Sequence, residues 1–68
     1  MEDAFRLLIE ASERLGSIAD LARVLHTDPQ RVYMWIADRD LPTGEELERL
    51  KQELRAIIAA QTRRRRTR

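Results

Sequence analysis

The sequence lacks cysteine and has only one histidine, His26. Disulfide bridges and thiolate zinc sites are therefore excluded, and we expect no bound metal or other cofactor. There is also no apolar run near the roughly 18 residues that a membrane span requires, and no signal-peptide pattern. We therefore expect a cytoplasmic protein without a membrane partner.

Patterns that carry catalysis are absent as well. No serine stands at a readable spacing from a histidine and a carboxylate, and the two glycines form no phosphate-binding loop. The paired acids Glu45 and Glu46 are explained by the start of a helix, where carboxylates are favourable. We expect that the chain is not an enzyme.

Charge is present in both signs but is unevenly distributed. Five of the 13 basic residues lie within 63–68, which leaves 8 basic against 12 acidic residues in 1–62. The folded part is thus mildly acidic, while the C-terminal end is strongly basic. Four consecutive arginines attract polyphosphate without reading its sequence.

Residues 17–38 predict two short helices joined by a tight turn. Ser17 is an N-cap candidate for the first, and Asp28 followed by Pro29 is typical of the start of the second. Apolar residues recur at helical spacing in both helices. They are Leu21, Ala22 and Leu25 in the first helix, and Val32, Trp35 and Ile36 in the second. The pattern indicates a helix-turn-helix.

This stretch resembles the helix-turn-helix of the Cro and lambda-repressor-like DNA-binding regulators of phage type. The matching residues are Leu21, Ala22, Arg23, Leu25, Asp28, Pro29, Gln30, Val32 and Trp35. The resemblance implies that the small Ala22 lets the second helix approach closely, and that Val32 and Trp35 hold that helix to the core. His26 stands where the family usually has glycine, and histidine tolerates the positive φ that the turn requires.

Helices are also expected on both sides of this stretch. Residues 2–15 place Phe5, Leu8, Ile9 and Leu15 on one apolar face, ending at Gly16. Thr43 and Glu46 form a capping-box sequence, from which a last helix should run to about Gln61. The expected fold class is all-α, a lambda-repressor-like bundle of four helices, or five if the last is broken. Residues 1–61 form the helix-turn-helix domain, and 62–68 a basic tail that is disordered or a frayed helix.

The resemblance implies a transcriptional regulator, similar to Cro-type repressors, that binds double-stranded DNA. Its helix 28–38 would enter the major groove, with Gln30, Tyr33 and Met34 facing base edges and Asp28 at the tip. Phosphate contacts would come from Ser17, Arg31 and Arg39. The tail residues Arg63, Arg64, Arg65 and Arg66 would add non-specific attraction for nucleic acid.

Such regulators commonly bind as homodimers. Residues Leu47, Leu50, Leu54 and Ile57 recur at spacings of three and four, and Ile58 widens the stripe. One interpretation is a fourth helix that only closes the bundle. The other is that Leu54, Ile57 and Ile58 form the dimer contact.

A protein-interaction module is the alternative function. An exposed Tyr33 and Met34 are compatible with a protein partner as well as with a DNA groove. The excess of acidic residues in 1–62 favours a protein partner. Ile18 also stands where the family often has a glutamine that contacts the DNA backbone. The partner would belong to a phage or transcription assembly, such as RNA polymerase, a repressor or a packaging subunit.

Overall fold

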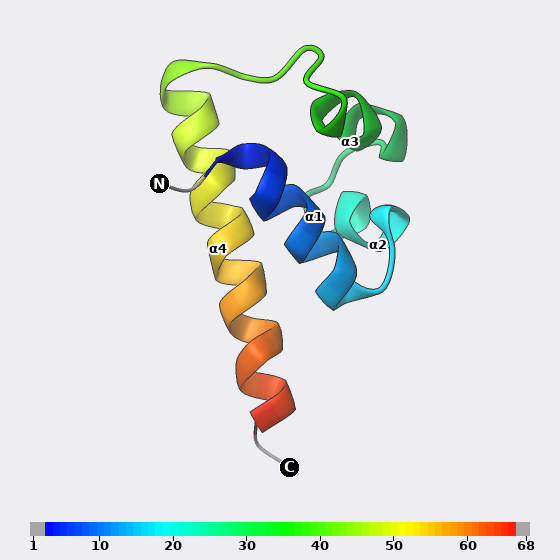
Figure 1. Cartoon of the computed structure of the whole chain (residues 1–68), viewed down its shortest axis with the longest axis vertical. Coiled ribbons are helices and arrows are strands. Elements are labelled where there is room, and N and C mark those ends of the chain that lie inside the picture. Colours follow the sequence, from blue (N-terminus) through cyan, green and yellow to red (C-terminus); the bar gives the residue numbers. More distant parts are fainter. Residues whose placement is uncertain (1–2, 67–68) are drawn as a thin grey trace.

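The computed structural model describes residues 3–66, and these form four helices and no strand. They are α1 (Ala4–Leu15), α2 (Ile18–Val24), α3 (Pro29–Ile36) and α4 (Gly44–Arg66) (Figure 1). The expected all-α bundle of four helices is confirmed. The last helix is continuous over its 23 residues. The alternative of five helices, in which the last helix is broken into two, is therefore wrong.

The helix that contacts all the others is α1. It packs against α2 and α3 on one side and against α4 on the other, whereas α4 packs closely only on α1. Figure 1 shows α1 and α4 running in the same general direction, with α2 and α3 grouped beside α1. The helix-turn-helix is therefore one of two units assembled on α1.

The core is built from small and medium-sized aliphatic side chains. Leu8, Leu21, Val32 and Leu54 are fully buried, one from each helix. Trp35 and Ile36 are partly buried and pack against this cluster, as the sequence pattern predicted. Burying each such side chain contributes about 1.5–3 kcal/mol, so few residues determine whether so short a chain folds.

The apolar face expected for α1 is partly wrong. Phe5 is 51% exposed, and Ile9 is only half-buried, whereas Leu7 belongs to the core at 5% exposed. Apolar residues occupy more than half of the α1 circumference near its start, so spacing alone does not say which of them are covered. Because α1 packs against α2 and α3 on one side and α4 on the other, Leu7, Leu8 and Ala11 are the residues that become buried.

Side chains cap the first two helices. The Asp3 carboxylate accepts a hydrogen bond from the Arg6 backbone N–H at 2.9 Å, so α1 begins at Ala4 rather than at residue 2. The Ser17 hydroxyl accepts from the Asp20 N–H at 3.1 Å, as predicted. Between them Gly16 ends α1 with a φ of 117°, a backbone conformation that strongly favours glycine.

We expect Ser17→Ala to lower the free energy of unfolding by about 1 kcal/mol, because the Asp20 N–H loses its acceptor. Urea denaturation followed by circular dichroism measures the difference. Ser17→Thr keeps a hydroxyl and serves as the control. Equal losses in the two variants would show that the capping hydrogen bond does not contribute.

The turn between α2 and α3 is short and hydrogen-bonded. The His26 N–H donates to the Arg23 carbonyl at 3.1 Å, and the Thr27 N–H donates to the Ala22 carbonyl at 2.9 Å. His26 has a φ of 59°, which confirms the positive φ expected there. Ala22 is 1% exposed at the start of this turn. The small side chain thus lies where α2 is packed into the core.

Three more residues with positive φ shape the connection from α3 to α4. Asp38 and Asp40 have φ values of 63° and 58°, and Gly44 at the start of α4 has 62°. Aspartate is one of the few non-glycine residues that tolerate this conformation. The chain between these residues crosses from the end of α3 to the start of α4 (Figure 1).

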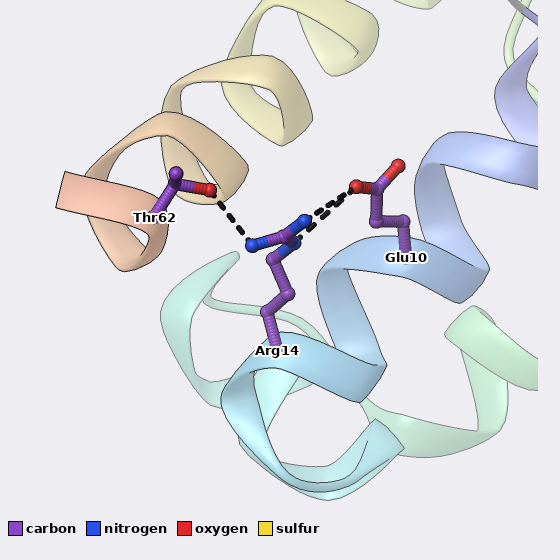
Figure 2. Close-up of polar contacts among 3 residues, drawn as sticks. All are labelled: Glu10, Arg14 and Thr62. Carbon is purple, nitrogen blue, oxygen red and sulfur yellow. Dashed lines mark hydrogen bonds and ion pairs between the residues drawn. The ribbon is translucent and has the colours of Figure 1, made fainter. Parts of the chain in front are cut away.

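Helix α4 extends to Arg66, beyond the expected end near Gln61. A polar contact holds its distal half to α1, because Arg14 Nη1 donates to Thr62 Oγ1 at 2.7 Å. The same guanidinium pairs with Glu10 Oε2 through Nη2 at 3.1 Å, and Figure 2 shows Arg14 lying between the two partners. Residues 62–66 thus belong to α4. Arg14 connects α1 to α4 through its hydrogen bond with Thr62.

Candidate nucleic-acid interface

Helix α3 presents one polar and accessible face. Residues spaced three and four apart share a helix face, so Gln30, Tyr33 and Met34 lie together. Gln30 is exposed, Tyr33 is 58% exposed and Met34 is half-buried. An amide, a phenol and a thioether thus share the surface that the sequence analysis assigned to base contacts.

The opposite face of α3 holds the helix in place. Val32 is fully buried, and Trp35 packs against the core cluster. Leu21 and Ala22 are buried in the same cluster, so α2 and α3 share one apolar interior. The packing of Val32 and Trp35 fixes the rotation of α3 about its axis, and thereby fixes which residues form its outer face.

The two arginines assigned to phosphate contacts are exposed. Arg31 makes no side-chain hydrogen bond or ion pair with another described residue, and it lines a groove beside Trp35. Arg39 follows the end of α3, where its backbone N–H donates to the Met34 carbonyl at 2.7 Å. They lie on the flank and at the C-terminal end of α3, outside the Gln30, Tyr33 and Met34 face.

Ser17 and Asp28 lie at the starts of α2 and α3. The Ser17 hydroxyl already accepts from the Asp20 N–H, and its own O–H is left to donate. Asp28 occupies the N-cap position of α3, but its side chain makes no capping hydrogen bond. Its predicted place at the start of the helix is confirmed, whereas its carboxylate caps no backbone N–H. The carboxylate is exposed beside the proposed groove-binding face.

The residues assigned to a dimer contact are not all accessible. Leu54 is fully buried in the core, so its assignment to an intermolecular contact is wrong. Ile57 and Ile58 are half-buried against the same cluster. The spacing of apolar residues along α4 could not distinguish a core residue from a residue available for a dimer contact. The side of α4 that packs on α1 and the neighbouring side are both apolar.

The tail arginines belong to the last turn of α4. The backbone of residues 63–66 is helical, and their side chains lie outside the part of the chain that the structure describes. The proposed nucleic-acid contacts of Arg63, Arg64, Arg65 and Arg66 therefore stay predictions.

Several features of the surface have no counterpart in the sequence analysis. Two grooves flank Trp35 and Leu41 where the α3–α4 connection crosses the molecule, and several carboxylates line them. The positive φ of Asp38 and Asp40 shapes this region. The closely spaced aspartates before Leu41 and Pro42 were the available signal, because aspartate is enriched at such positions.

No family model matches the chain, and no curated protein or solved structure is significantly similar to it. Residues 3–66 contain no helix that could span a membrane, being neither long nor apolar enough. The same residues contain no group of three histidine, cysteine or acidic side chains arranged to hold a metal ion.

Proposed function

We propose that the chain is a transcriptional regulator that binds double-stranded DNA in a sequence-specific way. Helix α3 enters the major groove with Gln30 and Tyr33 facing base edges, and Met34 contacts a thymine methyl group. Glutamine is suited to adenine, to which its amide can make two hydrogen bonds. The observation that carries the proposal is the exposed polar face of α3 on a helix anchored by the buried Val32.

Phosphate contacts position this helix in the groove. The free O–H of Ser17 at the start of α2 and the exposed guanidinium groups of Arg31 and Arg39 supply donors for phosphate oxygens. The arginine segment 63–68 adds attraction that does not depend on base sequence.

Dimerisation extends the proposal. Two copies would place their α3 helices about 34 Å apart to read two half-sites on one side of the duplex. Since Leu54 is buried, Ile57 and Ile58 remain as the contact on α4, and this small contact forms when the two copies occupy adjacent half-sites on DNA. A chain that stays monomeric in sedimentation experiments with its DNA site would remove this part of the proposal.

The experiment is a selection from random duplex DNA with the intact chain and with Gln30→Ala/Tyr33→Ala. We expect the intact chain to enrich a palindromic motif and the double variant to lose it, with a loss in affinity of at least about tenfold. A bidentate base contact alone is worth about 1–3 kcal/mol. The control Phe5→Ala/Gln52→Ala removes an exposed aromatic ring and an exposed amide elsewhere, and should keep the motif.

Salt dependence separates groove binding from attraction by the arginines. Binding through several phosphates weakens steeply with salt in either case, but groove binding keeps its sequence preference. The chain without residues 63–68 should bind more weakly yet select the same motif. If a folded chain selects no motif, the regulator proposal fails.

A second candidate is a protein-interaction module of a phage or transcription assembly. The exposed carboxylate of Asp28 precedes α3, and Asp38 and Asp40 follow it, so both ends of the helix carry negative charge. Such charge opposes DNA and suits a protein surface. In this case Gln30→Ala/Tyr33→Ala would weaken binding of that protein, and DNA would be bound only through the arginine segment.

A further inference from the structure

Two grooves share Trp35 and Leu41 in their lining, at the connection between α3 and α4. The first lies between α3 and the first three turns of α4, with Leu25 and Leu50 in its lining. The second runs between the ends of α1 and α3, with Phe5 in its lining. Trp35 and Leu41 line both grooves, so the two lie next to each other with these apolar side chains between them.

Acidic side chains surround this surface. Asp40, Glu46 and Glu53 line the first groove, and Asp3 and Asp38 line the second. Two arginines, Arg31 and Arg49, also line the first groove, so carboxylates predominate over guanidinium groups. Asp40, Glu46 and Glu53 form no ion pair with another described residue. The surface is thus partly apolar and net negative, and these three carboxylates are available to a partner.

A peptide rich in arginine has the complementary chemistry. Guanidinium groups pair with carboxylates through two parallel hydrogen bonds, and they stack on the face of a tryptophan ring. The chain itself contains such a peptide, since five of the six residues in 63–68 are arginine. Its five positive charges are opposite in sign to the excess of four acidic residues in the rest of the chain.

This segment cannot reach the grooves of its own copy. Glu53 is the last α4 residue in the first groove, and the helix continues for 13 residues to Arg66. At 1.5 Å per residue, Arg63 lies about 15 Å and Arg66 about 20 Å beyond Glu53 along the α4 axis. The remaining residues of the segment, 67 and 68, span at most about 7 Å even when fully extended. Any contact between segment and grooves therefore involves two copies.

We propose that the arginine segment 63–68 of one copy binds the acidic grooves around Trp35 and Leu41 of a second copy. The contact joins different surfaces of the two copies, so each copy keeps one free segment and one free groove surface. Contacts of this kind continue into chains or close into rings. The association requires no DNA and does not depend on the function proposed above.

The first test is sedimentation of the full chain without DNA. At about 0.01 M salt, where charges are weakly screened, we expect an average mass at least about twice that of the monomer. At about 1 M salt the mass should return to that of the monomer. Glu46→Lys/Glu53→Lys should be monomeric at both salt concentrations. The control Glu45→Lys/Glu48→Lys makes the same charge change on α4 outside these grooves and should still associate.

Mixing two variants tests the pairing of unlike surfaces. Arg63→Gln/Arg64→Gln/Arg65→Gln/Arg66→Gln keeps the grooves, whereas Glu46→Lys/Glu53→Lys keeps the arginine segment. Each should be monomeric alone, and an equimolar mixture should form a dimer and nothing larger. Circular dichroism establishes that both variants are helical before they are mixed.

Three results would overturn the proposal. The intact chain could be monomeric at low salt, which would leave the grooves to a different partner. Glu46→Lys/Glu53→Lys could associate as the intact chain does, in which case the segment binds another surface. The mixture could also remain monomeric although both variants are folded, which would exclude contact between the segment and these grooves.

Discussion

Leu54→Ala is expected to lower the free energy of unfolding by about 3 kcal/mol, enough to leave much of a chain this small unfolded at 25 °C. Leu54 is fully buried with Leu8 and Leu50 in the core, so truncation loses its burial and leaves a cavity. Urea denaturation followed by circular dichroism gives the free energy directly.

Leu47→Ala is the matched control on the same helix. Leu47 is half-buried and lies outside the core cluster, so we expect a loss below about 1 kcal/mol. The measurement is repeated over a wide range of protein concentration. A destabilisation by Leu54→Ala that varied with concentration would instead place this side chain in a contact between copies.

Ala22→Leu is expected to have the second largest effect. Ala22 is 1% exposed among the core side chains, and its carbonyl accepts from the Thr27 N–H in the turn before α3. Three extra carbon atoms must displace core side chains or push α2 outward, which costs about 1–3 kcal/mol. We expect the melting temperature to fall by roughly 10 °C in thermal denaturation.

Ala19→Leu controls for the change in residue type within the same helix. Ala19 is exposed on α2, so the larger side chain meets solvent and the melting temperature should change little. If both variants lowered the melting temperature equally, the effect of Ala22→Leu would not come from close packing around Ala22. The fluorescence of the single tryptophan, Trp35, reports whether the packing of α3 changes as well.

The charge distribution connects the two proposals. The arginine segment lies at the far end of α4 from the grooves, and Arg31 lines one groove while also serving as a proposed phosphate ligand. A segment bound beside Arg31 would therefore compete with DNA for the same flank of α3. High salt would weaken both interactions, so variants rather than salt alone must distinguish them.

Local sequence determined where α1 ends and where α2 and α3 begin, whereas α3 ends at Ile36 rather than at residue 38. Ser17, Pro29 and Gly16 act within a few residues of themselves, through a capping hydroxyl, a missing N–H and a positive φ. The positive φ of His26 was predicted on the same grounds. Such signals can be read without knowledge of the partners, because the atoms involved are neighbours in sequence.

The orientation of α3 in the candidate site could also be predicted from the sequence. The spacing of Val32 and Trp35 predicted the inner side of α3, and therefore the outer side with Gln30 and Tyr33. The state of the Asp28 side chain could not be predicted. An N-cap position allows a capping hydrogen bond without requiring it, and in the structure the carboxylate makes none.

Tertiary structure decided which apolar residues are buried and what lies between the helices. Phe5 and Leu7 are both apolar near the start of α1, yet only Leu7 is in the core, because α1 is enclosed by the helix-turn-helix on one side and α4 on the other. The Arg14–Thr62 contact arises in the same way, from residues 48 positions apart. Helical periodicity defines an apolar side of a helix, but only the partners that cover it determine which of its residues lose their contact with water.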